Sequence, residues 1–422
     1  MLRSLKKVLY FPFAWYFRLF AQIKLARWKP RIIVLTGSSG KTTLLHLVEA
    51  QIGARARYSH HANSAYGIPF DILGIKRITL EPSEWLGIIF KTPLRAFTKI
   101  PSQKIYIVEA DCDRPGEGSF LASLLKPEVT IWVSASRTHS MNFDPLVEKK
   151  AFAKVEEAIA YEYGFFLEHT SKLSIIDSDS QLIKRQTERT TSEILEINKK
   201  KNLDKYEVKD NNTFFSIDGK RYEFKFLLPE AVYFSVTATK KLMEFLELKF
   251  DSTFENFTVP PGRNSVFKGI KNTTLIDSSY NTGFAAYEQI LELLRSVEAN
   301  KKWAVIGDIL EQGKEEKEEH EKLAHLIAES DFDRIILLGP RIQKYGLAIL
   351  EKKYGDRVVS FLSPKEVLDF LNSNIQGGET ILFKGARFLE GVIEHLLLNK
   401  EDISKLSRRE KIWEKRREKW GL

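Results

Sequence analysis

Residues 36–43 read Thr36-Gly37-Ser38-Ser39-Gly40-Lys41-Thr42-Thr43, between a short β-branched run and a helical pattern that continues to about residue 51. Glycines let backbone N–H groups approach a phosphate, and the following helix presents its positive N-terminus to the same anion. Lys41 is placed to reach the β- and γ-phosphates of a nucleotide, and Thr42 offers a hydroxyl to Mg²⁺. We therefore predict a P-loop that binds phosphate through Gly37, Ser38, Ser39, Gly40, Lys41, Thr42 and Thr43.

Two further polar residues, Glu109 and His139, follow β-branched runs in the same way. Strands that alternate with helices are typical of parallel α/β structure, in which ligands lie at the carboxyl ends of the strands. A carboxylate beside a phosphate-binding loop suits Mg²⁺, so Glu109 is a predicted metal ligand. A lone histidine is usually structural, but a strand end favours a metal or substrate contact for His139. We interpret Asp111 and Asp113 as loop and helix-cap acids.

The second half of the chain predicts another α/β unit. Asp218-Gly219 between alternating apolar residues indicates a hairpin, a helix is expected at about 231–248, and Pro260-Pro261-Gly262 indicates a domain boundary. Beyond that boundary, strands are expected at 274–276, 303–306, 335–338, 358–361 and 380–383.

The predicted fold class is α/β, with a P-loop ATPase central domain on a mainly parallel sheet, followed by a Rossmann-like C-terminal domain. We expect a basic aromatic helix at 1–30, the central domain at 31–259, the C-terminal domain at 260–400 and a charged helical tail at 401–422. The charge run at 311–322 is expected to be a solvated helix face.

Composition excludes several classes of protein. The 422 residues, 43% hydrophobic and 29% charged, suit a soluble globular protein of two or three domains. The one cysteine, Cys112, excludes an internal disulfide and favours a reducing, cytoplasmic compartment. The net charge of +9 comes from the two ends of the chain, and residues 32–400 are slightly acidic. We therefore expect no nucleic-acid partner.

Residues 8–28 are rich in aromatic side chains and carry no acid. Their longest uncharged run spans ten residues, whereas a bilayer-spanning helix needs about 20. Arg18 and Lys24 interrupt the apolar stretch, which disfavours a signal peptide. Two alternatives remain open: the helix packs on the domain behind it, or residues 1–28 contact an anionic membrane surface.

Taken in order, these segments resemble the Mur ligase family, and within it the MurF-type members that join D-alanyl-D-alanine to UDP-N-acetylmuramoyl-tripeptide. The loop is similar to the shortened P-loop of the family, and residues 63–69 resemble its Asn-rich loop that ends in Gly-x-Pro. The resemblance makes Glu109 and His139 metal ligands. It also makes Lys154, in Lys154-Val155-Glu156, a carbamylated lysine that holds a second Mg²⁺.

The C-terminal half extends this resemblance. Residues 307–313 and 384–390 look like stretches of the MurF branch. The match implies nucleotide contacts for Arg263, Asp277, Tyr280 and Asn281, and substrate contacts for Asn63 and Lys384. The chain departs from the family at Glu230-Ala231, where a His-Asn pair helps to seat adenine, and at Ser278, where the family has an aspartate. About 31 basic aromatic residues stand where the family has its UDP-sugar domain.

The resemblance implies an ATP-dependent amide ligase of peptidoglycan precursor synthesis that phosphorylates a carboxylate, releases ADP and lets an amine attack the acyl phosphate. It makes Lys41, His139 and Lys154 catalytic, and it assigns two Mg²⁺ ions to Thr42, Glu109, His139 and Lys154. We expect a cytoplasmic monomer that acts on a nucleotide-sugar peptide. Two alternatives stay open: a ligase for another, lipid-linked carboxylate, and a nucleotide-dependent, membrane-associated scaffold that has lost ligation.

Overall fold

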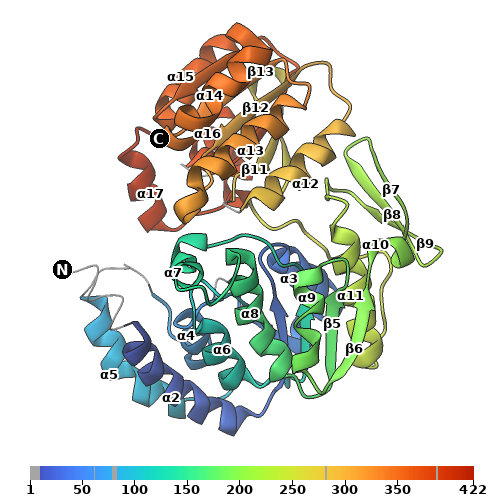
Figure 1. Cartoon of the computed structure of the whole chain (residues 1–422), viewed down its shortest axis with the longest axis vertical. Coiled ribbons are helices and arrows are strands. Elements are labelled where there is room, and N and C mark those ends of the chain that lie inside the picture. The colour runs from blue at the N-terminus through green and yellow to red at the C-terminus, as the bar shows by residue number, and fades with distance from the viewer. Residues whose placement is uncertain (1–9, 61, 78–82, 281–282, 386–387) are drawn as a thin grey trace.

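The computed structural model describes residues 10–60, 62–77, 83–280, 283–385 and 388–422, which form two α/β units (Figure 1). Each unit is built on a six-stranded sheet, and Pro260-Pro261-Gly262 lies between the two sheets in the sequence. In the described part of the chain, no helix combines the length and hydropathy needed to cross a bilayer.

The central sheet is parallel throughout, with strand order β2-β3-β1-β4-β5-β6. The strands are β1 Arg31–Thr36, β2 Ala56–Tyr58, β3 Ile105–Ala110, β4 Val129–Trp132, β5 Leu173–Asp177 and β6 Glu193–Ile197. The three strands predicted around the polar clusters are confirmed, whereas β2, β5 and β6 were not predicted. Strand β2 has only three residues, and β6 is a largely exposed edge strand, so neither shows the buried β-branched pattern.

Helices cover both faces of the central sheet because successive strand side chains point to opposite sides. Ile33 and Leu35 face α3 (Lys41–Ile52) and α11 (Val232–Phe245), whereas Ile32 and Val34 face the opposite core. The helices of that second core are α4 Gly67–Leu73, α6 Glu117–Leu125 and α8 Val155–Glu168. Short helices complete the unit: α7 Asp144–Glu148, α9 Gln181–Lys184 and α10 Lys199–Asn202.

The N-terminal helix α2 (Tyr10–Trp28) packs on the central domain beside α4 and α5 (Glu84–Phe97) (Figure 1). Its side chains Phe17 and Trp28 are fully buried. Arg18 and Lys24 are also buried, with Arg18 donating to the Phe120 carbonyl and Lys24 donating to Thr98 Oγ1 at 3.1 Å. Helix α2 therefore packs on the domain behind it, whereas membrane contact by residues 1–28 stays a prediction. Residues 1–9 lie outside the described residues.

The predicted hairpin is confirmed and belongs to a separate three-stranded sheet of β7 Leu203–Lys209, β8 Asn212–Ile217 and β9 Lys220–Phe224. Its turn has positive φ at both central residues, 49° at Asp218 and 73° at Gly219. These angles match the twist of the flanking strands, which explains why Asp-Gly stands here.

The C-terminal sheet has the order β10-β11-β15-β12-β13-β14, and only β10 runs antiparallel. The strands are β10 Ser265–Lys268, β11 Thr274–Ser278, β12 Lys302–Gly307, β13 Arg334–Leu338, β14 Val358–Phe361 and β15 Thr380–Lys384. All five predicted strands are present, and the α/β class with a Rossmann-like second unit is confirmed. One face packs on α12 Phe284–Arg295, α13 Glu316–Ala328 and α14 Pro340–Tyr354, and the other on α15 Pro364–Asn374 and α16 Leu389–Leu396.

The charged tail folds back on the C-terminal unit as a 3₁₀ segment, Lys400–Lys405, and α17, Lys411–Glu418. Arg408 forms an ion pair of 3.1 Å with the buried Glu390, and Arg417 is itself buried. The tail therefore packs against the unit it follows and, as shown below, lines a cleft.

Candidate active site

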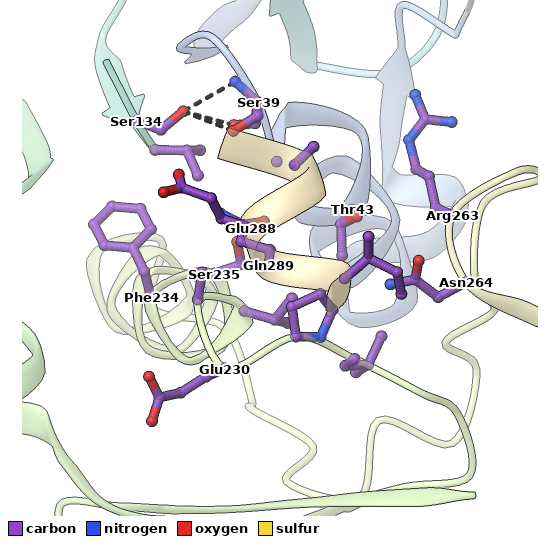
Figure 2. Close-up of a pocket in the computed structure, with 18 of the residues that line it drawn as sticks. Ser39, Thr43, Ser134, Glu230, Phe234, Ser235, Arg263, Asn264, Glu288 and Gln289 are labelled. Atoms are coloured by element: carbon purple, nitrogen blue, oxygen red, sulfur yellow. Dashed lines mark hydrogen bonds between the residues drawn. The ribbon is translucent and has the colours of Figure 1, made fainter. Parts of the chain in front are cut away.

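The phosphate-binding loop is held in shape by the segment that follows strand β4. Gly37 and Gly40 have φ of 131° and 84°, and a Cβ at Gly37 would lie 2.8 Å from the Ser134 carbonyl oxygen. The Ser39 N–H donates to Ser134 Oγ, which in turn donates to the Ser39 carbonyl, both at 2.9 Å (Figure 2). Glycine is therefore required at both positions.

Lys41 is a buried cation at the start of α3. Its Nζ lies 2.8 Å from Asp111 Oδ2 and also donates to the Gly37 carbonyl. Burial alone would lower the pKa of Lys41, but the carboxylates of Asp111 and Glu109 outweigh burial and raise it. The ammonium therefore stays charged beside the loop, as phosphate binding requires.

Three residues from different parts of the chain meet at Thr42. The Thr42 hydroxyl lies 2.9 Å from Glu109 Oε2, and Arg263 donates to the same hydroxyl oxygen at 3.0 Å. The hydroxyl and carboxylate are the hard oxygen donors that Mg²⁺ prefers, and Arg263 brings a guanidinium from beyond the linker. The residues present therefore fit a nucleotide with its magnesium ion.

His139 lies in a second cluster, at the contact between the two units. Its Nε2 is 3.2 Å from Asp113 Oδ1, and its Nδ1 pairs with the Glu311 carboxylate. Burial would lower the pKa of His139, but Glu311, Asp113 and Asp111 together raise it to about 9. Ligand atoms of Asp111, Asp113 and His139 lie within 4.8 Å of one another, so this group is able to hold a metal ion.

The structure corrects the roles expected for two acids and for one residue of the charge run. Asp111 is the counter-ion of Lys41 and Asp113 that of His139, so neither serves as a simple loop or cap acid. The helical part of the charge run lies on α13, where Lys317 and Glu318 are exposed as expected, whereas Glu311 precedes that helix and pairs with His139. The available signal was Asp111 directly after strand β3, at the sheet edge where the ligands of α/β folds lie.

Lys154 stands apart from these clusters. It precedes α8 in extended conformation, its side chain is exposed, and no contact joins it to the clusters among the described residues. Glu156, two residues further on, forms an ion pair of 3.2 Å with Arg137, so the start of α8 lies near the loop that carries His139. The metal role predicted for Lys154 stays a prediction.

A cleft of about 510 Å³ extends from the loop to the C-terminal unit. Figure 2 shows residues from four parts of the fold around it: Ser39 and Thr43 from the loop and α3, Glu230 and Ser235 at α11, Arg263 and Asn264 at the linker, and Glu288 and Gln289 on α12. The position where the family has a His-Asn pair, Glu230-Ala231, lies on this lining.

The predicted C-terminal contacts lie at or near this cleft. Lys384 lines it and is buried, and burial together with the nearby Arg263 lowers the pKa of Lys384 to about 7. Asp277 is fully buried, its Oδ1 accepts from the Ser279 N–H at 3.0 Å, and burial raises its pKa. The ring of Tyr280 lies 4.2 Å from the guanidinium of Arg263. Asn281 lies outside the described residues.

A second cleft, of about 840 Å³, adjoins the first. It is lined by Thr42, Glu109 and Asn63 from the central unit, and Arg263 and Tyr280 line both clefts. Part of its wall comes from the tail, where Arg408, Arg409 and Trp413 contribute side chains. The sequence had left the position of the tail open.

The comparisons with known proteins agree with this arrangement. Residues 262–387 match the model of the Mur ligase, glutamate ligase domain. The UDP-N-acetylmuramoyl-tripeptide--D-alanyl-D-alanine ligase of Bacillus subtilis is 22% identical over 384 residues, which cover 87% of this chain and 76% of the relative. The ligase of the same name from Borreliella burgdorferi is 21% identical over 379 residues, with 84% and 72% covered.

Solved structures share the fold over both units. The MurF ligase from Thermotoga maritima in complex with ADP has a TM-score of 0.72 at 19% identity and covers 93% of this chain and 84% of its own. MurF from Acinetobacter baumannii has a TM-score of 0.70 at 18% identity, with 90% and 79% covered. Residues 262–387 therefore form a Mur ligase C-terminal domain, and the chain shares the fold of the MurF structures through the loop and the central sheet as well.

Proposed function

We propose that this chain is an ATP-dependent amide ligase of the MurF type, which joins D-alanyl-D-alanine to a UDP-muramoyl peptide in peptidoglycan precursor synthesis. One observation carries the proposal. The Thr42 hydroxyl lies 3.0 Å from both the Glu109 carboxylate and the Arg263 guanidinium, at the place where the two clefts adjoin. One cleft extends along the loop, and the other opens in front of Glu109. A nucleotide and a carboxylate substrate are therefore able to approach the same point from two sides.

Each side chain around that point has its own role in such a reaction. ATP supplies the phosphoryl group that activates the carboxylate, and Mg²⁺ offsets the negative charge of the phosphates. Lys41 and the amides of the loop offset further charge, and Thr42 with Glu109 would hold the magnesium ion. Arg263, on the linker, orients the phosphates from the opposite side. Positioning supplies the rate, so no side-chain nucleophile is needed.

We propose a second ion beside the first. Asp111, Asp113 and His139 form a donor set for it, and their position next to Lys41 keeps it near the transferred group. Carbamylation of Lys154 would convert an exposed cation into a fourth, anionic ligand. ¹³C-bicarbonate labelling should give a carbamate resonance in the wild-type protein that is absent from Lys154→Ala. A spectrum without that resonance would remove the carbamate from the mechanism.

The main proposal is tested by ADP release with UDP-muramoyl-tripeptide and D-alanyl-D-alanine. The expected result is turnover that needs both substrates and is lost in Lys41→Met, whereas the exposed Lys172→Met keeps it. Turnover with a lipid-linked carboxylate but not with UDP-muramoyl-tripeptide would support the alternative of a ligase for another carboxylate. Nucleotide binding without turnover of any acceptor would leave the scaffold alternative, and it would contradict ligation.

We also propose that the enzyme works on the cytoplasmic side of a membrane, docked through α5 and α2. Helix α5 exposes Leu86, Phe90, Leu94 and Phe97, each by 65–77%, at spacings of four, four and three residues. Such spacing puts all four on one helix face. The neighbouring α2 adds Phe13, Trp15 and Leu19, and an apolar patch of this kind marks an interaction surface.

The charges around this apolar patch indicate its partner. Lys91, Arg95 and Lys99 are exposed along α5 and its end. Among the described residues of α2 and α5, Glu84 is the one acid, and its Oε2 lies 3.9 Å from Arg77 Nε. Apolar side chains flanked by cations match an anionic lipid surface, as on the cytoplasmic leaflet.

Vesicle sedimentation tests the membrane proposal. The full chain should bind phosphatidylglycerol-containing vesicles more strongly than pure phosphatidylcholine, and Phe90→Ser with Leu94→Ser should abolish binding. Leu362→Ser, an exposed leucine of the C-terminal unit, is the matched control. Equal sedimentation of wild type and the double variant would overturn the proposal. If the wild-type chain self-associates and the double variant does not, the apolar patch binds a second copy of the chain instead of a membrane.

A further inference from the structure

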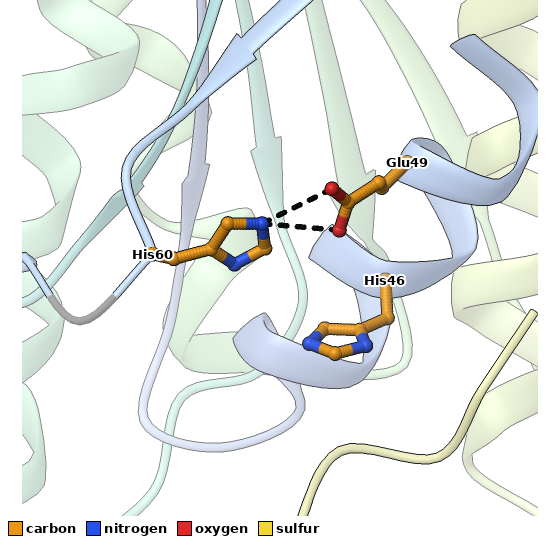
Figure 3. Close-up of side chains that lie close together, drawn as sticks. All are labelled: His46, Glu49 and His60. Carbon is orange, nitrogen blue, oxygen red and sulfur yellow. Dashed lines mark hydrogen bonds and ion pairs between the residues drawn. The ribbon is translucent and has the colours of Figure 1, made fainter. Parts of the chain in front are cut away.

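A third group of ligating side chains lies outside the machinery described above. His46, Glu49 and His60 each offer a ligand atom, and these atoms lie within 4.8 Å of one another (Figure 3). His60 Nε2 is 3.1 Å from Glu49 Oε2, and the rings of His46 and His60 are 5.7 Å apart. We call these three residues the His46 cluster.

Two rigid elements hold the His46 cluster together. His46 and Glu49 are three residues apart on α3, so their side chains share one face of that helix. His60 follows Ser59, whose N–H donates to the Ile107 carbonyl at 3.0 Å and whose Oγ accepts from the Glu109 N–H at 2.9 Å. The cluster is therefore anchored to the helix and the strand that carry Thr42 and Glu109.

The orientation of His46 suits a metal ligand. Its Nδ1 lies 3.2 Å from the Thr258 carbonyl, an acceptor, so Nδ1 carries the proton and Nε2 keeps its lone pair. Ligating histidines commonly donate their other ring nitrogen to a carbonyl in this way, which fixes the tautomer. Burial and the neighbouring His60 lower the pKa of His46, so the ring is neutral at physiological pH.

We propose that His46, Glu49 and His60 form a transition-metal site of the Zn²⁺ class, separate from the magnesium site. Two imidazoles with one carboxylate are typical of zinc, whereas Mg²⁺ prefers oxygen ligands alone. A metal bound at His60 Nε2 would replace the contact of that nitrogen with Glu49, and the ring proton would sit on Nδ1.

Three protein ligands leave one position of a tetrahedral ion open. All three residues line the cleft of about 840 Å³ that also contains Thr42, Glu109 and Asn63. The open position therefore faces the space in front of the phosphate-binding loop, where it takes water or an anionic oxygen of a bound molecule. The Thr258 carbonyl links the same site to the segment just before Pro260.

Zn²⁺ titration of the full chain by calorimetry, without nucleotide or substrate, tests the site, and the visible absorption of bound Co²⁺ reports imidazole ligation. His46→Ala and His60→Ala should each weaken Zn²⁺ binding by roughly 100-fold or more. His325→Ala removes an exposed histidine of α13 and should change nothing. Glu49→Gln nearly preserves the side-chain shape and keeps the test valid where an alanine variant fails to fold.

Two results would overturn the inference. One is Zn²⁺ affinity unchanged in both histidine variants. The other is binding lost in His139→Ala but kept in His46→Ala, which would assign the ion to the Asp111, Asp113 and His139 group. Neither result bears on ADP release, so the zinc site and the proposed ligase activity fail independently.

Discussion

Arg263 donates a hydrogen bond of 3.0 Å to the hydroxyl of Thr42, although 221 residues separate them in the sequence. The contact ties the linker between the two sheets to the first turn of α3. The Arg263 guanidinium also lies 4.2 Å from the ring of Tyr280, which lines both clefts. The phosphate-binding loop thus receives a cation from outside its own unit, and closure of the two units would set the position of that cation.

Replacing Arg263 by lysine should therefore impair catalysis more than folding. Lysine keeps the charge but loses the fork that spans Thr42 and the phosphates, so we expect kcat to fall by about 10²–10³-fold. Steady-state ADP release measures the effect, and Arg185→Lys on the exposed surface is the control. An unchanged kcat would show that Arg263 only joins the units.

The buried pair of Lys41 and Asp111 should behave as one unit in folding. Lys41→Met leaves Asp111 buried without its cation and should lower the free energy of unfolding by about 3 kcal/mol or more. Adding Asp111→Asn removes the unpaired charge and should restore much of that loss. Urea unfolding of the single and double variants measures the coupling. Strictly additive effects would mean that the two groups do not interact.

The stability of the protein should depend on pH through His139. Its folded pKa of about 9 lies above the ordinary value of 6.5. The ion pairs with Glu311 and Asp113 therefore stabilise the fold fully below about pH 6.5, and this stabilisation is lost as the pH rises through 9. His139→Gln should flatten that part of the profile in urea unfolding with a metal chelator present. A variant profile parallel to wild type would contradict the pairing.

Cys112 should be unreactive until the protein unfolds. Its thiol is fully buried, and burial, followed by the charge of Glu162, raises its pKa well above the ordinary value. Because the thiolate is the reactive form, a disulfide reagent should label none of the native protein and one thiol per chain in denaturant. Rapid labelling of the native state would show that the core beneath β3 opens.

Several features could be predicted from local patterns. The loop at 36–43 has glycine at the positions that need positive φ, and the hairpin turn has Asp218 and Gly219 at the two positions that need it. The exposed face of α5 has an equally clear pattern, since Leu86, Phe90, Leu94 and Phe97 repeat at helical spacing, although the membrane contact was predicted at residues 1–28. Strands β2 and β6 escaped prediction because short or exposed strands carry little hydrophobic pattern.

The sequence alone determined most of the elements and the phosphate-binding loop, because backbone sterics and hydrophobic period act over a few neighbouring residues. Only the tertiary structure decided which side chains meet. The pairing of Glu311 with His139, the approach of Arg263 to Thr42 and the convergence of His60 on His46 each join segments that are distant or lie on different elements. Such contacts depend on the order of the strands and the packing of the two units, which no local pattern specifies.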